Sequence, residues 1–204
     1  MRTENVVCTF HSQALDTGVG RIVDALKAAG LYNNSIIVFS TDNGGVSGST
    51  SNHPLRGAKE TLYEGGVRGV AWVHSPHLTQ TGVENTAMMY VTDWLATLLA
   101  VAGLEALQPQ DTDSINMWPS ISWGRESPRE EIVLNLDQDN YHGLWSAAII
   151  RGNYKLIWGQ PDLLKVKVRP GQHIWRKSVQ GPEKSCQVEL YHVGKDPQEK
   201  SNLV

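Results

Sequence analysis

The stretch IIVFSTDNGG, residues 36–45, decides the fold predicted for this chain. Its first four residues are β-branched or aromatic without interruption, which is the pattern of a strand buried on both faces. The polar and glycine-rich residues that follow favour a loop at the end of that strand. Upstream, apolar residues recur every three or four positions over residues 16–29, which predicts an amphipathic helix that ends at Gly30. A helix, a short turn and a buried strand make half of an α/β unit.

Further elements follow along the chain. A second buried strand is predicted over residues 69–73, and a second helix over residues 93–102, with Thr92 as its N-cap and Gly103 as its end. Later come short strand-like runs at residues 131–136, 147–151, 154–158 and 188–192, and Gly152-Asn153 between two of them indicates a hairpin. We therefore predict an α/β part over residues 1–125 and a small antiparallel subdomain over residues 126–204, with the boundary near residues 124–128.

The composition excludes several classes of function. The 204 residues carry 18 basic and 21 acidic side chains, a net charge of −3, so a nucleic-acid-binding surface has no electrostatic support. No apolar run approaches the roughly 18 residues of a membrane-spanning helix, and the first residues contain no apolar signal-peptide core. Cys8 and Cys186 have neither CxxC nor zinc-ligand spacing, so they indicate no disulfide framework and no structural metal site.

Asp42 and Asn43 are the first candidates for chemistry. They place a carboxylate and an amide carbonyl side by side at the end of a predicted strand, where ligands of open α/β sheets bind. Oxygen ligands of this kind suit a hard cation such as calcium or magnesium. The alternative is a turn in which both side chains bond the backbone before two glycines.

A glycine-rich segment between the two predicted strands carries three cationic residues. It contains PLRGAK at residues 54–59 and EGGVRG at residues 64–69, with Arg56, Lys59 and Arg68. Glycine lets a backbone approach a ligand closely, while Lys and Arg supply charge for an anion. The alternative is a surface loop whose charges are solvated.

The order of these motifs resembles the sulfatase family, and is most similar to its arylsulfatase B-like branch. The resemblance runs from the helix at residue 16 to the C-terminus. It rests on residues 37–45, 55–59, 63–70, 75–76, 92–95, 148–156, 189–191 and 196–197.

The resemblance implies a fold, an activity and a site. The expected fold is an α/β alkaline-phosphatase-like sandwich, here partial, followed by a small C-terminal antiparallel α+β subdomain. The expected reaction is hydrolysis of sulfate esters, either of an aryl substrate or of a sulfated glycan such as a glycosaminoglycan, with calcium and a cysteine-derived formylglycine. Asp42 and Asn43 would be two calcium ligands, and Lys59 would bind a sulfate oxygen and favour the departing charge. His53 and His142 are weaker candidates for contact with substrate.

The sequence also departs from the family pattern. The family's nucleophile lies in a C-x-P-S-R string, and neither Cys8 nor Cys186 stands in one. The early Asp-Asp pair, the Lys-x-His segment and the later sulfate-binding His are missing as well, so the chain resembles the C-terminal part of a sulfatase. We expect this chain alone not to be catalytically competent. The competing hypotheses are an inactive truncated product that binds a metal or a sulfated glycan, and phosphoester hydrolysis at the same kind of site.

Asn33-Asn34-Ser35 is a glycosylation sequon on a predicted surface turn. This observation suits a lysosomal or secreted parent protein, although no signal peptide is visible in these residues. The expected partner is a sulfate-ester substrate, with no nucleic acid and no membrane span.

Overall fold

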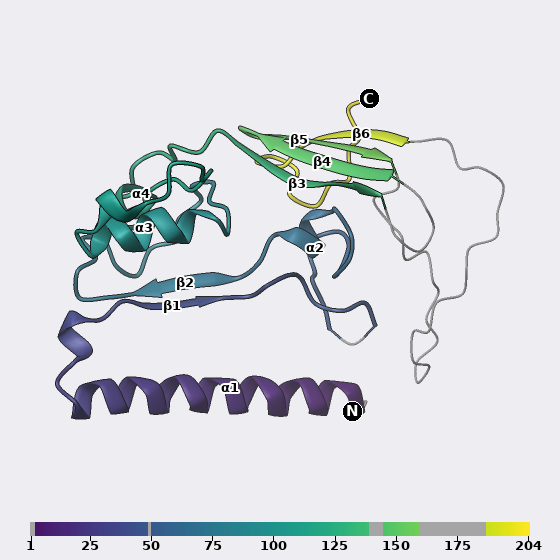
Figure 1. Cartoon of the computed structure of the whole chain (residues 1–204). Coiled ribbons are helices and arrows are strands. Elements are labelled where there is room, and N and C mark those ends of the chain that lie inside the picture. The colour runs from purple at the N-terminus through teal and green to yellow at the C-terminus, as the bar shows by residue number, and fades with distance from the viewer. Residues whose placement is uncertain (1–2, 49, 139–144, 160–186) are drawn as a thin grey trace. The chain divides into compact units, whose positions relative to one another are not determined.

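The computed structural model describes residues 3–48, 50–138, 145–159 and 187–204. Its helices and strands, in chain order (Figure 1), are α1 (Thr3–Ala28), η1 (Tyr32–Asn34), β1 (Ile37–Ser40), α2 (Glu64–Val67), β2 (Ala71–His74), α3 (Asp93–Val101), η2 (Glu105–Leu107), α4 (Trp118–Trp123), β3 (Glu131–Gln138), β4 (Trp145–Arg151), β5 (Tyr154–Gly159) and β6 (Gln187–His192).

The chain divides into two compact units that interleave in sequence. The sheet unit comprises Met1–Gly20, Ser40–Val70 and Val133–Val204, and the helical unit comprises Arg21–Phe39 and Ala71–Ile132. Each unit is built from separate stretches of the chain, so it brings together residues that are far apart in the sequence. The linear boundary between residues 125 and 126 stays a prediction.

In the helical unit, β1 and β2 form a two-stranded sheet whose strands run in opposite directions (Figure 1). Phe39 of β1 stacks on Trp72 of β2, with ring centroids 5.7 Å apart. The prediction that β1 is buried on both faces is wrong for the described part of the chain, because Val38 is 37% exposed and its neighbours are only half-buried. A strand with a single partner leaves its other edge and part of its faces open.

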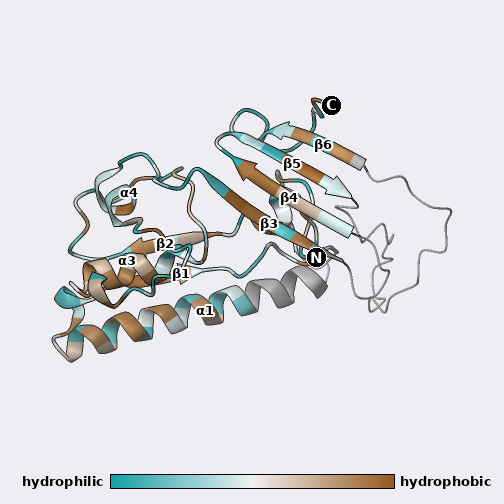
Figure 2. Cartoon of the chain, turned by 45° about the horizontal axis from the view of Figure 1, so that its top comes forward, coloured by the Kyte–Doolittle hydropathy of each residue, from teal (hydrophilic) through white to brown (hydrophobic). Residues whose placement is uncertain are grey.

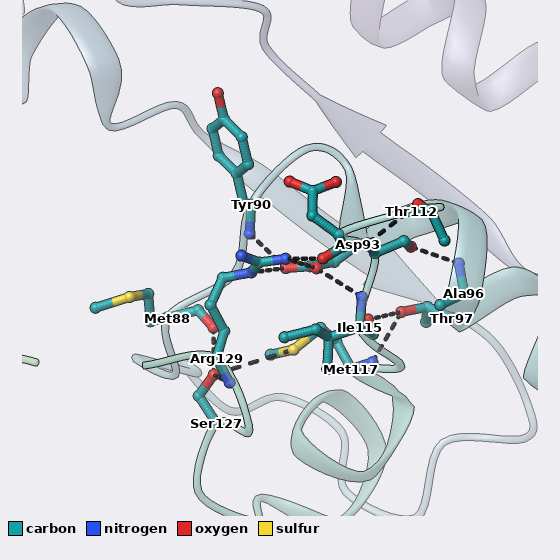
Figure 3. A network of polar contacts seen from close by, with 12 residues as sticks. Met88, Tyr90, Asp93, Ala96, Thr97, Thr112, Ile115, Met117, Ser127 and Arg129 are labelled. Atoms are coloured by element: carbon teal, nitrogen blue, oxygen red, sulfur yellow. Dashed lines mark hydrogen bonds and ion pairs between the residues drawn. The ribbon is translucent and has the colours of Figure 1, made fainter. Parts of the chain in front are cut away.

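Helix α3 is held in the helical unit by a buried carboxylate at its first residue (Figure 3). Asp93 is fully buried and accepts hydrogen bonds from the Arg129 guanidinium, with Nη2 2.5 Å and Nε 2.7 Å away. It also accepts from the backbone amides of Tyr90, at 2.8 Å, and Ile115, at 3.0 Å. The hydrogen bonds to Asp93 raise the pKa of Arg129. A buried ion pair of this kind is tolerated because every charge has partners.

Thr92 precedes α3 as predicted, but the prediction that its side chain caps the helix is wrong. Thr92 has helical backbone angles, φ −65° and ψ −23°, so its side chain makes no capping bond, and its hydroxyl is buried without a partner in the described residues. Asp93 accepts the amide of Tyr90, which precedes the helix, and Ser114 Oγ accepts the helix amide of Ala96 at 2.8 Å. The predicted end of the helix is confirmed, since Gly103 has the left-handed φ of +70° that favours glycine.

In the sheet unit, β3 to β6 form a four-stranded sheet in the order β3-β4-β5-β6. Strands β4 and β5 are antiparallel and close at Arg151 opposite Tyr154, which confirms the predicted hairpin at Gly152-Asn153. Along β5, exposed and buried residues alternate. The apolar core of this unit consists of Tyr63, Ala148, Ile157 and Tyr191.

Two further differences from the predictions have local causes. Helix α1 begins at Thr3 rather than at residue 16, because residues 3–15 contain no proline or glycine that would end a helix. Figure 2 shows hydrophobic and hydrophilic residues alternating along α1, but Leu15 and Ile22 of its apolar positions are more than half exposed. The short helix α2 lies where the sequence predicts a loop.

Candidate functional site

The loop that follows β1 places Asp42 and Asn43 at the start of the site. Asp42 is exposed and Asn43 is half-buried. One Asp42 oxygen, Oδ1, accepts the Asn43 amide at 2.8 Å, and Asn43 Nδ2 donates to the Gly44 carbonyl at 3.0 Å. Both side chains therefore bond the backbone, as the turn interpretation expects. Within the described residues, Asp42 Oδ2 and Asn43 Oδ1 make no hydrogen bond, so each residue keeps one oxygen available to a ligand.

Two glycines bring this loop into contact with the segment that contains Lys59. The Gly44 amide donates to the Gly66 carbonyl at 2.9 Å, so the loop crosses directly over α2. A Cβ on Gly44 would lie 1.7 Å from the Gly65 carbonyl oxygen, and one on Gly65 would lie 2.5 Å from the Arg56 carbonyl oxygen. Only glycine fits such a crossing, which explains the Gly-Gly pairs that the sequence shows in both segments.

Lys59 lies beside the same loop through its backbone. Its amide donates to the Gly45 carbonyl at 3.1 Å, two residues from Asn43. The Asn52 side chain fixes this junction, because it accepts the Gly45 amide at 2.7 Å and donates to the carbonyls of Gly45 and Gly57 at 3.0 and 3.2 Å. The structure thus brings together the backbone of three predicted site residues, Asp42, Asn43 and Lys59. Their chemical roles stay predictions.

Ion pairing distinguishes Lys59 from the other two cationic residues of the segment. Arg56 is 3.7 Å from the Glu189 carboxylate, donates to the hydroxyls of Tyr63 and Tyr191 at 2.8 Å each, and stacks on the Tyr63 ring. Arg68 lies 3.8 Å from Glu64. Lys59 is exposed and has no carboxylate within ion-pair distance among the described residues. Lys59 is therefore the cation of this segment whose charge is available to an external anion.

The Arg56 side chain is 41% exposed, but its charge already has partners in the protein. Burial and the hydrogen bond to Glu189 raise the pKa of Tyr191 to about 12. Burial also raises the pKa of Tyr63 above the ordinary tyrosine range. Both phenols therefore stay neutral near pH 7, and the Arg56 charge is compensated by Glu189. Sequence reasoning grouped Arg56 with Lys59 because Glu189, the partner of Arg56, lies far away along the chain, on β6.

The remaining predicted residues have different outcomes. His53 is exposed, and its described hydrogen bond is the one from its backbone amide to Ser51 Oγ at 3.3 Å. His142 lies outside the described residues. Asn33 is exposed on η1, where a glycan has access to it. Asn52 is the site residue that sequence reasoning missed, and its place between two glycine-rich segments was the available signal.

Comparisons with known proteins identify the family to which this chain belongs. A family model described as Sulfatase matches residues 11–104. Arylsulfatase J of Mus musculus is 38% identical over 162 residues, which cover 72% of this chain and 27% of the mouse protein. N-acetylgalactosamine-6-sulfatase of Sus scrofa is 28% identical over 201 residues, covering 93% of this chain and 37% of the pig protein. The crystal structure of Ps i-CgsB superposes with a TM-score of 0.69 at 28% identity, covering 93% of this chain and 37% of that one.

The chain belongs to the sulfatase family. It spans between about a quarter and two fifths of the length of the relatives that it matches. The fold class predicted from the sequence is confirmed, since the structure is a mixed α/β arrangement that covers part of the alkaline-phosphatase-like fold of solved sulfatases.

Proposed function

We propose that this chain is part of a sulfuric ester hydrolase, in which Asp42 and Asn43 contribute calcium ligands and Lys59 binds the sulfate group. The observation that carries the proposal is a pair of backbone hydrogen bonds, from Gly44 to Gly66 and from Lys59 to Gly45. They join the loop after β1 to the segment that contains Lys59. A carboxylate oxygen and an amide oxygen on a loop joined to the segment of the exposed Lys59 suit a cation and a tetrahedral anion bound together.

Each side chain has a definable task in this proposal. When bound, calcium would neutralise negative charge on the sulfate oxygens. Asp42 Oδ2 and Asn43 Oδ1 are the atoms that fit it, because their other polar atoms already bond the backbone. Among the described residues no group of three His, Cys, Asp or Glu side chains forms a metal site, so the proposal assigns calcium only these two side-chain ligands. The Lys59 ammonium would donate to a sulfate oxygen and stabilise the charge that leaves with it.

A formylglycine does not fit the residues at hand. Cys8 and Cys186, the two cysteines of this sequence, both stand outside a C-x-P-S-R string. We therefore assign this chain binding and charge stabilisation, and assign it no nucleophile.

A sulfated glycan is the substrate class that we propose. One matched relative carries the name N-acetylgalactosamine-6-sulfatase, and Ps i-CgsB has also been crystallised with k-i-k-neocarrahexaose. In the described part of the chain, no helix is long and apolar enough to cross a membrane. The exposed sequon at Asn33 supports a secreted or lysosomal parent protein.

The test is calcium-dependent binding of inorganic sulfate and 4-nitrocatechol sulfate to the 204-residue chain, followed by NMR at the Lys59 amide. Removal of the ammonium in Lys59→Ala should weaken sulfate binding about 10-fold to 100-fold, because a hydrogen bond from a charged group contributes about 1.5–3 kcal/mol. Lys195→Ala, which removes another exposed lysine of the sheet unit, is the matched control and should change binding less than twofold. Equal affinities in the two variants would disprove the role of Lys59. Turnover of 4-nitrocatechol sulfate by this chain alone would disprove our view that it lacks the nucleophile.

A further inference from the structure

A buried lysine lies on the core face of β5. Lys155 is 0% exposed, although lysine is among the residues least often buried. Its Nζ donates to Glu64 Oε1 at 3.0 Å and lies 2.9 Å from Glu199 Oε1, in an ion pair without hydrogen-bond geometry. Neither partner belongs to the sheet, because Glu64 opens α2 and Glu199 lies in the segment that follows β6. The cluster of Lys155, Glu64 and Glu199 therefore ties two loops to the sheet.

Glu199 is held in place by the backbone around it. Asp196 accepts the amides of Lys200 and Ser201 at 2.8 Å each, which forms the turn that carries Glu199. Glu199 itself has a φ of +52°, a left-handed conformation that non-glycine residues seldom adopt. Its second oxygen, Oε2, accepts the Glu64 amide at 2.7 Å. Glu199 and Lys155 are 1% and 0% exposed, and this burial raises the pKa of Glu199.

Helix α2 connects the cluster to the candidate site. Its first residue, Glu64, contacts both other members of the cluster. Its next residues contact the site segments, since the Gly65 amide donates to the Arg56 carbonyl at 2.6 Å and the Gly66 carbonyl accepts the Gly44 amide. A continuous series of direct contacts therefore runs from Lys155 through α2 to the loop that contains Asp42 and Asn43. A second series runs from Lys155 through α2 to the segment that contains Lys59.

We propose that Glu64, Lys155 and Glu199 are positioning residues, through which the antiparallel sheet sets the position of α2 and hence of the two site loops. The inference rests on the proposed function of Asp42, Asn43 and Lys59. A cluster that only stabilised the sheet would pair Lys155 with residues of neighbouring strands, whereas its two carboxylates lie on α2 and in the segment after β6. Arg56 adds a parallel connection, because it joins the same segment to Tyr191, which pairs with Lys155 in the β5–β6 register.

Amide hydrogen exchange of the full 204-residue chain tests the proposal without any ligand. In Glu64→Gln and Glu64→Ala, the amides of Gly44 and Lys59 should lose at least about tenfold in protection, because the loss of a charged hydrogen bond frees α2 to open. Their amide chemical shifts should move as well. Amides of the β4–β5 ladder, such as that of Ile157, should keep their protection within about twofold. Glu60→Gln is the matched control, since it removes the same charge at an exposed position next to Lys59.

Two results would overturn the proposal. One is unchanged protection at Gly44 and Lys59 in both Glu64 variants. The other is an equal loss over the loops and the β4–β5 ladder, which would make the cluster a general stabiliser of the sheet unit. If Glu64→Ala does not fold, Glu64→Gln decides alone. Failure of the proposed function would look different. The wild-type chain would then show no calcium-dependent sulfate binding, while the Gly44 and Lys59 amides would still lose protection in the Glu64 variants.

Discussion

Gly44 is the residue at which the fold and the candidate site depend most directly on each other. In Gly44→Ala the new Cβ would lie 1.7 Å from the Gly65 carbonyl oxygen. Cβ atoms in proteins essentially never approach another heavy atom closer than 3.0 Å, so the two loops would have to separate by about 1.3 Å where they cross. The neighbour is backbone, which cannot rotate away as the end of a flexible side chain can. Overpacking costs about 1–3 kcal/mol, and the loss of the Gly44 to Gly66 bond adds about 0.5–1.5 kcal/mol.

We therefore expect Gly44→Ala to lower the free energy of unfolding by about 1.5–4.5 kcal/mol. With a denaturant slope of about 2 kcal/mol/M, the urea midpoint measured by tryptophan fluorescence should fall by about 1–2 M. Gly18→Ala is the control, because Gly18 lies inside α1, where an added Cβ would meet no atom within 4 Å, and it has no positive φ. That substitution should be neutral or stabilise by up to about 1 kcal/mol. A Gly44→Ala midpoint equal to that of the wild type would refute the crossing of the two loops.

Two further predictions concern buried charges. Asp93→Asn should lower the free energy of unfolding by about 3–5 kcal/mol, because it leaves the Arg129 guanidinium buried without its counter-charge; a urea midpoint within about 0.3 M of the wild type, equivalent to about 0.6 kcal/mol, would contradict this. For Glu199, burial raises the pKa above the ordinary 4.5, so its contribution to stability is fully present below pH 4.5 and is lost as pH rises through the folded-state pKa. The wild type should therefore lose stability relative to Glu199→Gln as pH rises above 4.5, and parallel pH curves for the two proteins would show that Glu199 does not titrate in this way.

Much of the candidate site could be predicted because its signals are local. The strand-to-loop transition before Asp42 and the paired glycines are visible in short windows of sequence. The glycines indicated a close approach of backbone, and the structure shows which segments approach, namely residues 44–45 and 57–66. What could not be predicted is that Arg56 is neutralised and Lys59 is not, because the carboxylate that decides this, Glu189, lies on β6.

The sequence alone determined the elements whose cause lies within a few residues. The hairpin at Gly152-Asn153 and the end of α3 at Gly103 follow from local backbone preferences, which act wherever those residues occur. Only the tertiary structure decided the partners of Lys155, which are 91 and 44 positions away along the chain. A buried charge is stable only beside opposite charges, and the path of the whole chain determines which charges those are.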